Sequence, residues 1–291
     1  MCFWNRKRGC VIAVRSMIVG IIVCAIHCSP VLQGESGSTV TVCDVGQGLS
    51  QIYTHQNHCV IFDMGPAIGF SGWNNAYRAL GSPGIDAIVI SHSHEDHYGG
   101  LDSLPESADF SGVIITHAFE DTALVRSHCG AWKSKIRFVH KIASDTIGVS
   151  ANASITCVWP DDSWGLSAVV PDSLKNRYSM CWKITHGRTA FLITSDIDSI
   201  TTKALSTRYG VDLHADIAIV PHHGSATALD PVFWGFVRPA EAIISCARYN
   251  SYGHPSRTVV DLLFGTAIAV RETYVTGTMS IYSNGYYCVF R

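Results

Sequence analysis

The residues of this chain with the clearest chemical capacity lie together in the run His92-Ser93-His94-Glu95-Asp96-His97. Histidines two positions apart in an extended segment point the same way, so His92 and His94 can hold one metal ion. Asp96 and His97, in the turn that follows, can reach a second ion beside the first. Imidazole and carboxylate ligands together suit Zn²⁺, Mn²⁺ or iron, and not Ca²⁺. The spacing therefore predicts a metal centre of one or two ions.

Three apolar segments that read as strands each lead into a residue able to bind a metal. The pairs of segment and residue are Ile85–Ser91 with His92, Thr189–Thr194 with Asp196, and Asp216–Val220 with His222 and His223. Ligands on loops at the ends of rigid strands are how a sheet scaffold builds a site. His254 follows a fourth such strand, Ala242–Ser245, and is either part of this site or an ordinary loop histidine.

The remaining histidines after residue 34 follow no ligand spacing, and we interpret them as ordinary surface or core residues. They are His55, His58, His117, His128, His140, His186 and His214. Cys181 and Cys246 have no base partner in the sequence, so a cysteine nucleophile is not indicated. The seven cysteines after residue 34 show no C-x-x-C spacing, which argues against a zinc ribbon, and we expect them to be small buried apolar side chains. An oxidising compartment would still permit one or two disulfides.

The histidine run resembles the H-x-H-x-D-H signature of the metallo-β-lactamase superfamily. Further motifs extend the resemblance to the C-terminal metallo-β-lactamase domain of the competence protein ComEC, a DNA-uptake channel. These motifs are Asp44-Val45-Gly46-Gln47-Gly48, Ile61-Phe62-Asp63-Met64-Gly65, Ile90-Ser91-His92, Pro221-His222-His223-Gly224-Ser225 and Tyr252-Gly253-His254-Pro255-Ser256. The similarity spans roughly residues 39–277.

The resemblance implies a role for each matching residue. The metal ligands would be His92, His94, Asp96, His97, the bridging carboxylate Asp196, and His223. His222 would then face the substrate, and Asp96 would also orient the nucleophile. His254 would complete a metal shell or contact the scissile phosphate. The implied catalytic residues are therefore Asp96, His222 and His254.

Two departures from the family pattern bear on these roles. The superfamily usually places a third histidine before the hairpin that leads to the bridging aspartate, whereas Asn176 stands at about that point here. One metal position therefore lacks a strong ligand, which predicts two sites of unequal affinity, or a single ion. The second departure is Leu49-Ser50, where the ComEC branch often carries an acidic residue. It concerns a local hydrogen bond and not the metal site.

The elements that must position these residues alternate between strands and helices. We expect strands at 39–44, 51–54, 59–62, 85–91, 112–116, 136–139, 154–159, 180–185, 189–194, 216–220 and 242–245. Helical patterns fall at 120–128, from about 196 to 209, and at 230–237, and His186-Gly187-Arg188 is a hairpin turn. Together with the resemblance, this predicts an α/β fold, a four-layer αββα sandwich formed by one domain over residues 38–291.

Residues 1–34 differ from the rest of the chain. Arg6, Lys7, Arg8 and Arg15 precede an apolar run from Met17 to Ile26, and small or polar residues follow. That order is typical of a secretory signal peptide, and the run is short for a membrane span. An uncleaved N-terminal membrane anchor and a misplaced start are the alternatives. We therefore predict an exported protein, periplasmic, extracellular or membrane-anchored, whose only membrane contact is this segment.

The charge of the remainder limits the partners that it can bind. Without the first 34 residues, 17 basic residues stand against 23 acidic ones, a net charge of −6. An acidic body lacks the basic footprint of a protein that grips nucleic acid by its phosphates. The resemblance nevertheless implies a nuclease acting on DNA, and no protein partner can be inferred.

The function expected from these features is hydrolysis of a phosphoester by a metal-activated water, with zinc or manganese as cofactor. The expected substrate is a phosphodiester, and DNA is one such substrate. The alternatives are a choline-phosphate headgroup, a lactone, a β-lactam, or a non-catalytic envelope or DNA-uptake module that keeps the fold. The clustered imidazoles and carboxylates argue against a purely structural module.

Overall fold

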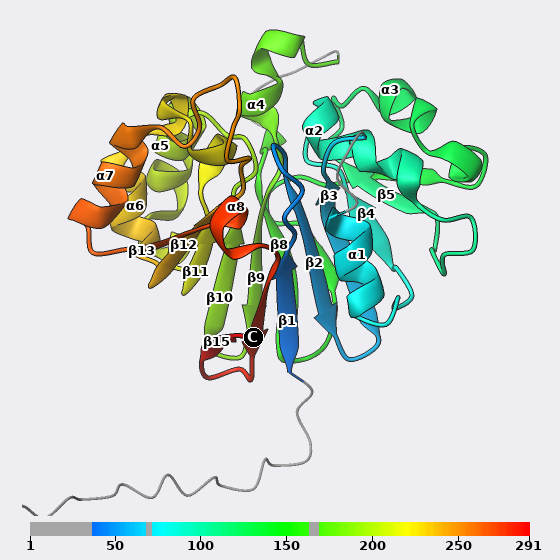
Figure 1. Ribbon diagram of the computed structural model, residues 1–291, viewed down its shortest axis with the longest axis horizontal. Helices are drawn as coiled ribbons and strands as arrows, with labels where there is room; N and C mark the ends of the chain where they lie inside the picture. Colours follow the sequence, from blue (N-terminus) through cyan, green and yellow to red (C-terminus); the bar gives the residue numbers. More distant parts are fainter. Residues whose placement is uncertain (1–36, 68–71, 163–168) are drawn as a thin grey trace, which may run out of the picture. The chain divides into compact units, whose positions relative to one another are not determined.

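The computed structural model describes residues 37–67, 72–162 and 169–291, which build two β-sheets with helices on their outer faces (Figure 1). The segment 1–34, which we expect to be a leader, lies outside these residues. Among the described helices, none combines the length and the hydropathy that crossing a bilayer requires.

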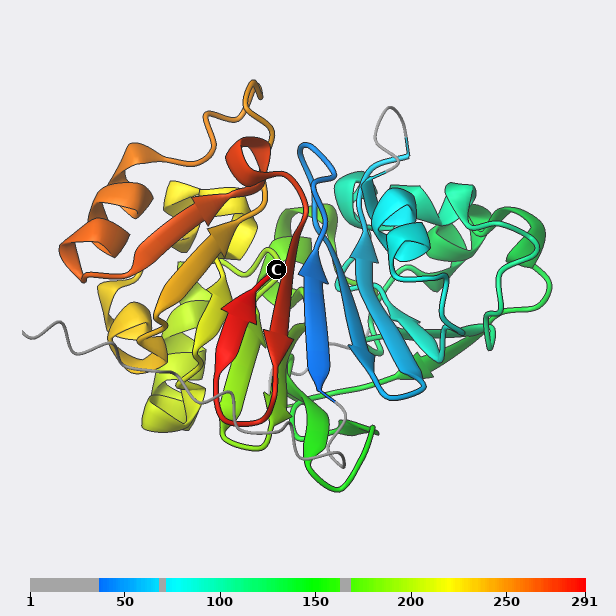
Figure 2. The same ribbon diagram turned by 60° about the horizontal axis from the view of Figure 1, so that its bottom comes forward.

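The first sheet has eight strands in the order β15-β14-β1-β2-β3-β4-β5-β6. Their bounds are β1 Ser38–Val42, β2 Ser50–His55, β3 His58–Met64, β4 Ala87–Val89, β5 Val113–Thr116, β6 Arg137–His140, β14 Met279–Ser283 and β15 Cys288–Phe290. Strands β3 to β6 run parallel to one another. Strand β14 pairs antiparallel with β1, with Val40 opposite Ile281, so the two ends of the described chain lie side by side (Figure 2).

The second sheet has seven strands in the order β13-β12-β11-β10-β9-β8-β7. Their bounds are β7 Thr146–Gly148, β8 Ala153–Trp159, β9 Cys181–His186, β10 Thr189–Ile193, β11 Ile217–Ile219, β12 Glu241–Ile244 and β13 Ala269–Glu272. The predicted hairpin is confirmed: β9 and β10 pair antiparallel, and Gly187 takes a φ of 55° in the turn between them. Strands β10 to β13 are parallel.

The α-helices follow the strands in both halves of the chain. Their bounds are α1 Gly72–Ala79, α2 Glu95–Tyr98, α3 Thr122–Ser127, α4 Lys175–Tyr178, α5 Ser199–Tyr209, α6 Pro231–Val237, α7 Arg257–Gly265 and α8 Thr273–Thr276. The helix expected at 120–128 is shorter than predicted. Asp121 caps it, since its side chain accepts a hydrogen bond from the Leu124 N–H at 3.0 Å, and the helix therefore begins at Thr122.

Three apolar clusters correspond to the three contacts between four layers. The first fills the space between the two sheets and includes Phe62 and Trp182, whose ring centroids lie 6.0 Å apart. The second packs the first sheet against α1 through Trp73. The third packs the second sheet against α5 and α6, with Trp234 at its centre. The predicted αββα sandwich is thus confirmed.

The seven cysteines in the described part of the chain are free thiols. Six of them are buried and Cys288 is half-buried. Burial raises the pKa of Cys43, Cys59, Cys157 and Cys246 to about 12, so these side chains stay protonated and behave as apolar core residues.

Candidate metal centre

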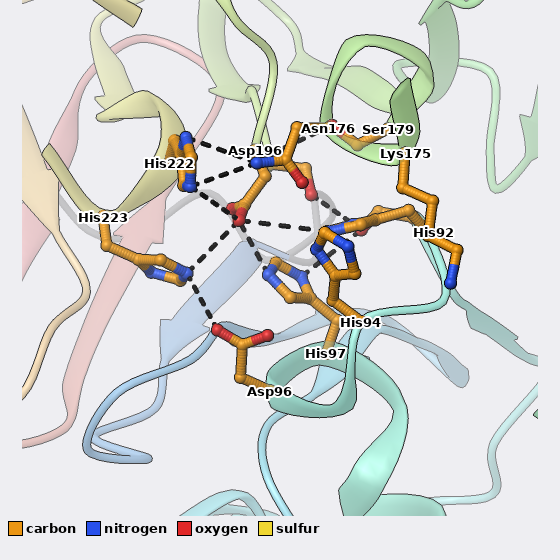
Figure 3. Close-up of polar contacts among 12 residues, drawn as sticks. His92, His94, Asp96, His97, Lys175, Asn176, Ser179, Asp196, His222 and His223 are labelled. Carbon is orange, nitrogen blue, oxygen red and sulfur yellow. Dashed lines mark hydrogen bonds and ion pairs between the residues drawn. The ribbon is translucent and has the colours of Figure 1, made fainter. Parts of the chain in front are cut away.

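The candidate site lies where loops leave parallel strands of both sheets. Strand β4 ends three residues before His92, β10 three residues before Asp196, and β11 three residues before His222. The side chains carried by these loops point toward one another (Figure 3). The strand-end pattern of the sequence therefore corresponds to one place in the fold.

The loops of the site and the end of β3 contain left-handed backbone at several non-glycine residues. Non-glycine residues take positive φ values at Asp63 (53°), Ser195 (47°), His222 (51°) and His223 (55°). Such conformations cost free energy and persist where the surroundings fix them, which is common at functional sites. Here the consecutive pair His222 and His223 is turned so that both rings face Asp196.

Asp196 is the carboxylate on which the site converges. One of its oxygens, Oδ1, lies 3.3 Å from His97 Nε2, and the other, Oδ2, lies 3.5 Å from His223 Nε2 and 4.0 Å from His92 Nε2. Asp96 Oδ2 lies 3.4 Å from the same nitrogen of His223. Two groups of potential ligands result, with His97 in both: His92, His97 and Asp196, and Asp96, His97 and His223.

The separations between these atoms fit metal coordination. Two ligand atoms about 2.1 Å from one ion at a tetrahedral angle lie about 3.4 Å apart. Buried ligand atoms of three residues also lack a hydrogen-bond partner: His97 Nε2, Asp196 Oδ1 and His223 Nε2. Buried polar atoms without partners are rare. Divalent cations held by the two groups of ligands would satisfy these atoms, so the residues fit such ions.

His94 lies beside this constellation and is not a member of either group. Its Nδ1 lies within hydrogen-bonding distance of His92 Nε2, at 2.9 Å. The other nitrogen, Nε2, faces the exposed carboxylate of Asp172 at 3.6 Å. The structure therefore places His94 at the outer side of the site, where it contacts His92.

Hydrogen bonds from outside the site fix which nitrogen of each histidine faces inward. His97 Nδ1 lies 2.8 Å from Asp63 Oδ2, and His223 Nδ1 lies 2.8 Å from the Ser245 carbonyl oxygen. Asp63 is itself held by the backbone N–H and the hydroxyl of Ser91, both at 2.8 Å. Each outer partner leaves the Nε2 of its histidine free for an ion, the arrangement that metal-binding histidines usually have.

Carboxylates surround the buried histidines of the site and stabilise their protonated forms. Burial alone would lower the pKa of His97, but Asp196, Asp63 and Asp96 raise it well above its ordinary value. Burial is likewise overcome at His223, where Asp196 and Asp96 raise the pKa to about 10. Burial opposes ionisation of Asp196 as well, yet His223 and His97 hold its pKa well below its usual range. Each of these histidines carries a proton that a metal ion would displace.

The candidate substrate-facing residues line a cavity of about 370 Å³ above the ligands. His222 Nε2 is 3.9 Å from Asp196 Oδ2, and Asn176 Nδ2 is 3.1 Å from the same nitrogen of His222. His254 packs against both neighbours, with ring centroids 5.5 Å from His222 and 6.3 Å from His223. Burial and the nearby His222 and His223 lower the pKa of His254 to about 4, so it is neutral at pH 7.

Sequence reasoning missed several residues that support the site. Asp63 was noted only as part of a motif, because its contact with His97 crosses 34 residues and depends on its left-handed backbone. Lys175 holds the ligand loop by donating to the Ser93 carbonyl oxygen at 3.0 Å. Buried His117 pairs with buried Glu120 at 3.2 Å, a contact that no ligand spacing in the sequence indicates.

Comparison with protein families gives a match in the first half of the chain. The family described as the metallo-β-lactamase superfamily matches residues 43–163, which include the run from His92 to His97.

Curated relatives cover most of this chain. Competence protein ComA of Neisseria gonorrhoeae is 26% identical over 253 residues, which is 84% of this chain and 32% of that protein. ComE operon protein 3 of Bacillus subtilis (strain 168) is 24% identical over 285 residues, 90% of this chain and 35% of that protein. The chain spans about a third of the length of these two relatives. The resemblance expected from the motifs is confirmed.

Solved structures share the fold at low sequence identity. The metallo-β-lactamase fold protein YhfI from Bacillus subtilis has a TM-score of 0.55 and 12% identity, covering 86% of this chain and all of that chain. The CmlA β-hydroxylase has a TM-score of 0.53 and 14% identity, covering 83% of this chain and 53% of that chain. A metal-dependent hydrolase of the β-lactamase superfamily has a TM-score of 0.51 and 16% identity, covering 83% and 98%. The chain has the metallo-β-lactamase fold, and that fold alone does not fix the reaction.

Proposed function

We propose that this metallo-β-lactamase-fold chain is a metal-dependent phosphodiesterase. The observation that carries the proposal is the convergence of buried, unpartnered histidine and aspartate atoms at the base of a cavity of about 370 Å³. The proposed ligands are His92, His94, Asp96, His97, Asp196 and His223. We propose zinc or manganese as the cofactor, bound as one ion or two.

A divalent cation in this position supplies Lewis acidity and a nucleophile that is active near neutral pH. The chain's own residues supply orientation and charge. The Asp96 side chain is only part-buried, so it can accept a hydrogen bond from a nucleophile that enters by the cavity. His222 and His254 line the same cavity, and burial lowers the pKa of both. As neutral imidazoles they can donate an N–H to charge that develops on a phosphoryl oxygen.

DNA is the phosphodiester that the ComEC resemblance implies, and one relative is named competence protein ComA while another is named ComE operon protein 3. We propose that this chain acts on such a polymer, or on short pieces of it, without gripping it tightly. The net charge of −6 beyond residue 34 supports weak binding to long duplex DNA. We also propose that the protein is exported, because residues 1–34 have the pattern of a secretory leader.

The test is a substrate panel on the full chain loaded with Zn²⁺ or Mn²⁺. Bis-p-nitrophenyl phosphate should be hydrolysed faster than p-nitrophenylphosphorylcholine, a lactone or a β-lactam. Asp96→Asn should lose this activity, whereas His128→Gln should keep it, because His128 pairs with Asp102 at the surface. Faster turnover of the phosphorylcholine diester would reassign the substrate, and faster turnover of the lactone or the β-lactam would reassign the reaction. No turnover of any substrate by the metal-loaded chain would favour the non-catalytic module.

A further inference from the structure

The cavity above the ligands is bounded on one side by the loop that follows β12, and this loop carries an aromatic side chain without an assigned role. Tyr252 lines the cavity although its side chain is 69% exposed. A tyrosine that is this exposed gains little stability from packing. Its position beside the candidate metal ligands calls for a different explanation.

One face of the Tyr252 ring is covered, and the residue as a whole is 69% exposed. The covered face lies against His254, with ring centroids 5.7 Å apart and an interplanar angle of 23°. His254 is in turn stacked on the proposed ligand His223, at 6.3 Å and 29°. The three rings form a ladder from the buried ligand to the surface. Tyr252 therefore presents an exposed ring that lines the cavity, is supported by His254 and lies two rings along from the proposed ligand His223.

The loop is rigid enough to hold the Tyr252 ring in place. Asn250 makes four hydrogen bonds across it. Its Nδ2 donates to the carbonyl oxygens of Ala247 at 3.0 Å and His254 at 2.6 Å, and its Oδ1 accepts from the N–H groups of Tyr252 at 3.1 Å and His254 at 3.0 Å. Between the two rings, Gly253 takes a φ of 71° that a larger residue would adopt only with strain. A ring held in this way loses little conformational entropy when a ligand stacks on it.

The chemistry of the cavity favours a neutral planar ligand on the Tyr252 ring. Recognition of a quaternary ammonium usually needs several aromatic rings around the cation. Among the described residues that line the cavity, Tyr252 is the one tyrosine, phenylalanine or tryptophan. The neighbouring carboxylates of Glu95 and Asp96 and the acidic body offer no cationic track for additional phosphates. Stacking is the contact that can hold a nucleic acid here, because every base has a π-face.

We propose that Tyr252 stacks on a nucleobase next to the phosphodiester that the site cleaves, and so sets the preference for nucleotide substrates. This inference rests on the proposed phosphodiesterase function. It assigns Tyr252 as a specificity residue that contacts the substrate away from the reacting atoms.

The test compares a thymidine dinucleotide with the same dinucleotide made from abasic residues, so that no other aromatic group competes for the ring. In the metal-loaded full chain, Tyr252→Leu should raise KM for the thymidine dinucleotide roughly 5- to 100-fold, with kcat changed little. Its KM for the abasic dinucleotide should stay at the wild-type value. Tyr252→Phe should restore wild-type behaviour. The matched control is Tyr249→Leu on the same loop, which removes a tyrosine that is 89% exposed and does not line the cavity.

A binding measurement separates this inference from the proposed function. The dissociation constant of a phosphorothioate thymidine dinucleotide is measured for the same variants, whether or not the chain hydrolyses phosphodiesters. Weaker binding by Tyr252→Leu alone, with unchanged metal content, supports the stacking contact even in a chain without activity. Equal binding by all variants, no binding by the wild type, or loss of phosphorylcholine binding alone in Tyr252→Leu would each overturn it.

Discussion

Asp63 shows most clearly how single residues outside the ligand set can control this site. It accepts from His97 Nδ1 at 2.8 Å and thereby leaves Nε2 facing Asp196. The sequence pattern could predict the ligands, because His92, His94, Asp96 and His97 are neighbours along the chain. The pattern could not show that Asp63 supports these ligands, because the contact of Asp63 with His97 forms only in the folded sheet.

Replacing Asp63 by asparagine should therefore weaken metal binding without removing a ligand. The amide can present an N–H to His97 Nδ1, which favours the wrong tautomer. Loss of such an outer partner typically costs about 10- to 100-fold in metal affinity. Competition with a chromophoric chelator measures this directly. The control is Asp86→Asn, whose partner His58 is exposed and far along the chain from the ligands; it should bind metal like the wild type.

Asn176 is the residue at which this chain departs from the family pattern, and its side chain does reach the cavity. Its Oδ1 is buried without a hydrogen-bond partner, and its Nδ2 contacts His222. Because an amide is a much weaker ligand than imidazole, we expect two metals of unequal affinity. Asn176→His should tighten the weaker site, so that stepwise dialysis against a mild chelator no longer removes one metal first. Two equal sites in the wild type would contradict this ligand assignment.

The titrating histidines also set how metal binding depends on pH. His97 and His223 have raised pKa values, with Asp196 as their largest source of attraction. Both hold protons at pH 7 that must leave before an ion can bind. Calorimetric titrations in buffers of different ionisation enthalpy should therefore show proton release. Apparent affinity should fall between pH 8 and pH 6. Binding without proton release would show that the Nε2 atoms of these histidines are not ligands.

At the scale of elements, short strands and short helices carry the site, and their caps matter. Asp198 begins α5 by accepting from the N–H groups of Ile200 at 3.1 Å and Thr201 at 3.0 Å. It also pairs with Arg177 of α4 at 3.0 Å. One carboxylate thus ties the main helix of the second half to the short helix that carries Asn176.

Asp198→Ala should lower the free energy of unfolding by about 1–2 kcal/mol through the lost cap. Because it also releases Arg177, it should loosen α4 and weaken metal binding. Urea denaturation and metal titration measure the two effects. Asp230→Ala is the comparison, since it removes the cap of α6, which carries no proposed site residue. If both variants lose stability and neither loses metal affinity, α4 does not depend on Asp198.

Most strands of the first half and the three strand ends are predictable from alternation and apolar runs. The sequence patterns do not predict strands β7, β13, β14 and β15 or helices α1, α2, α4, α7 and α8. The alternation of apolar Met279 and Ile281 with Ser280 and Tyr282 is a sequence signal for β14. Its partner β1, however, lies at the other end of the chain. Such a pairing is fixed by the closed fold and not by local sequence.

At the scale of the whole molecule, the metal-free chain should have a stability optimum set by the site. Burial would lower the pKa of His223, but Asp196 and Asp96 raise it from 6.5 to about 10. A raised pKa contributes stability that is complete below about pH 6.5 and is lost as pH rises through about 10. The depressed pKa of Asp196 contributes stability that is present above about pH 4 and is lost as pH falls further.

The melting temperature of the metal-free chain should therefore fall between pH 6.5 and pH 10. With metal bound, the same range should show no such fall, because the ion has replaced the protons. His223→Gln should flatten the metal-free profile as well. A metal-free melting temperature that rises over this range would show that the histidine and carboxylate pairs are not formed in solution.

The most direct test of the central claim measures bound metal and phosphodiesterase activity in the same samples. The full metal-free chain is titrated with Zn²⁺ or Mn²⁺, and the metal retained is compared with the rate on bis-p-nitrophenyl phosphate. We predict that the rate rises in step with one bound ion, and that Asp196→Asn loses both tight binding and turnover while remaining folded. Activity without metal, or tight binding and full activity in Asp196→Asn, would contradict the assignment of this site as a hydrolytic metal centre.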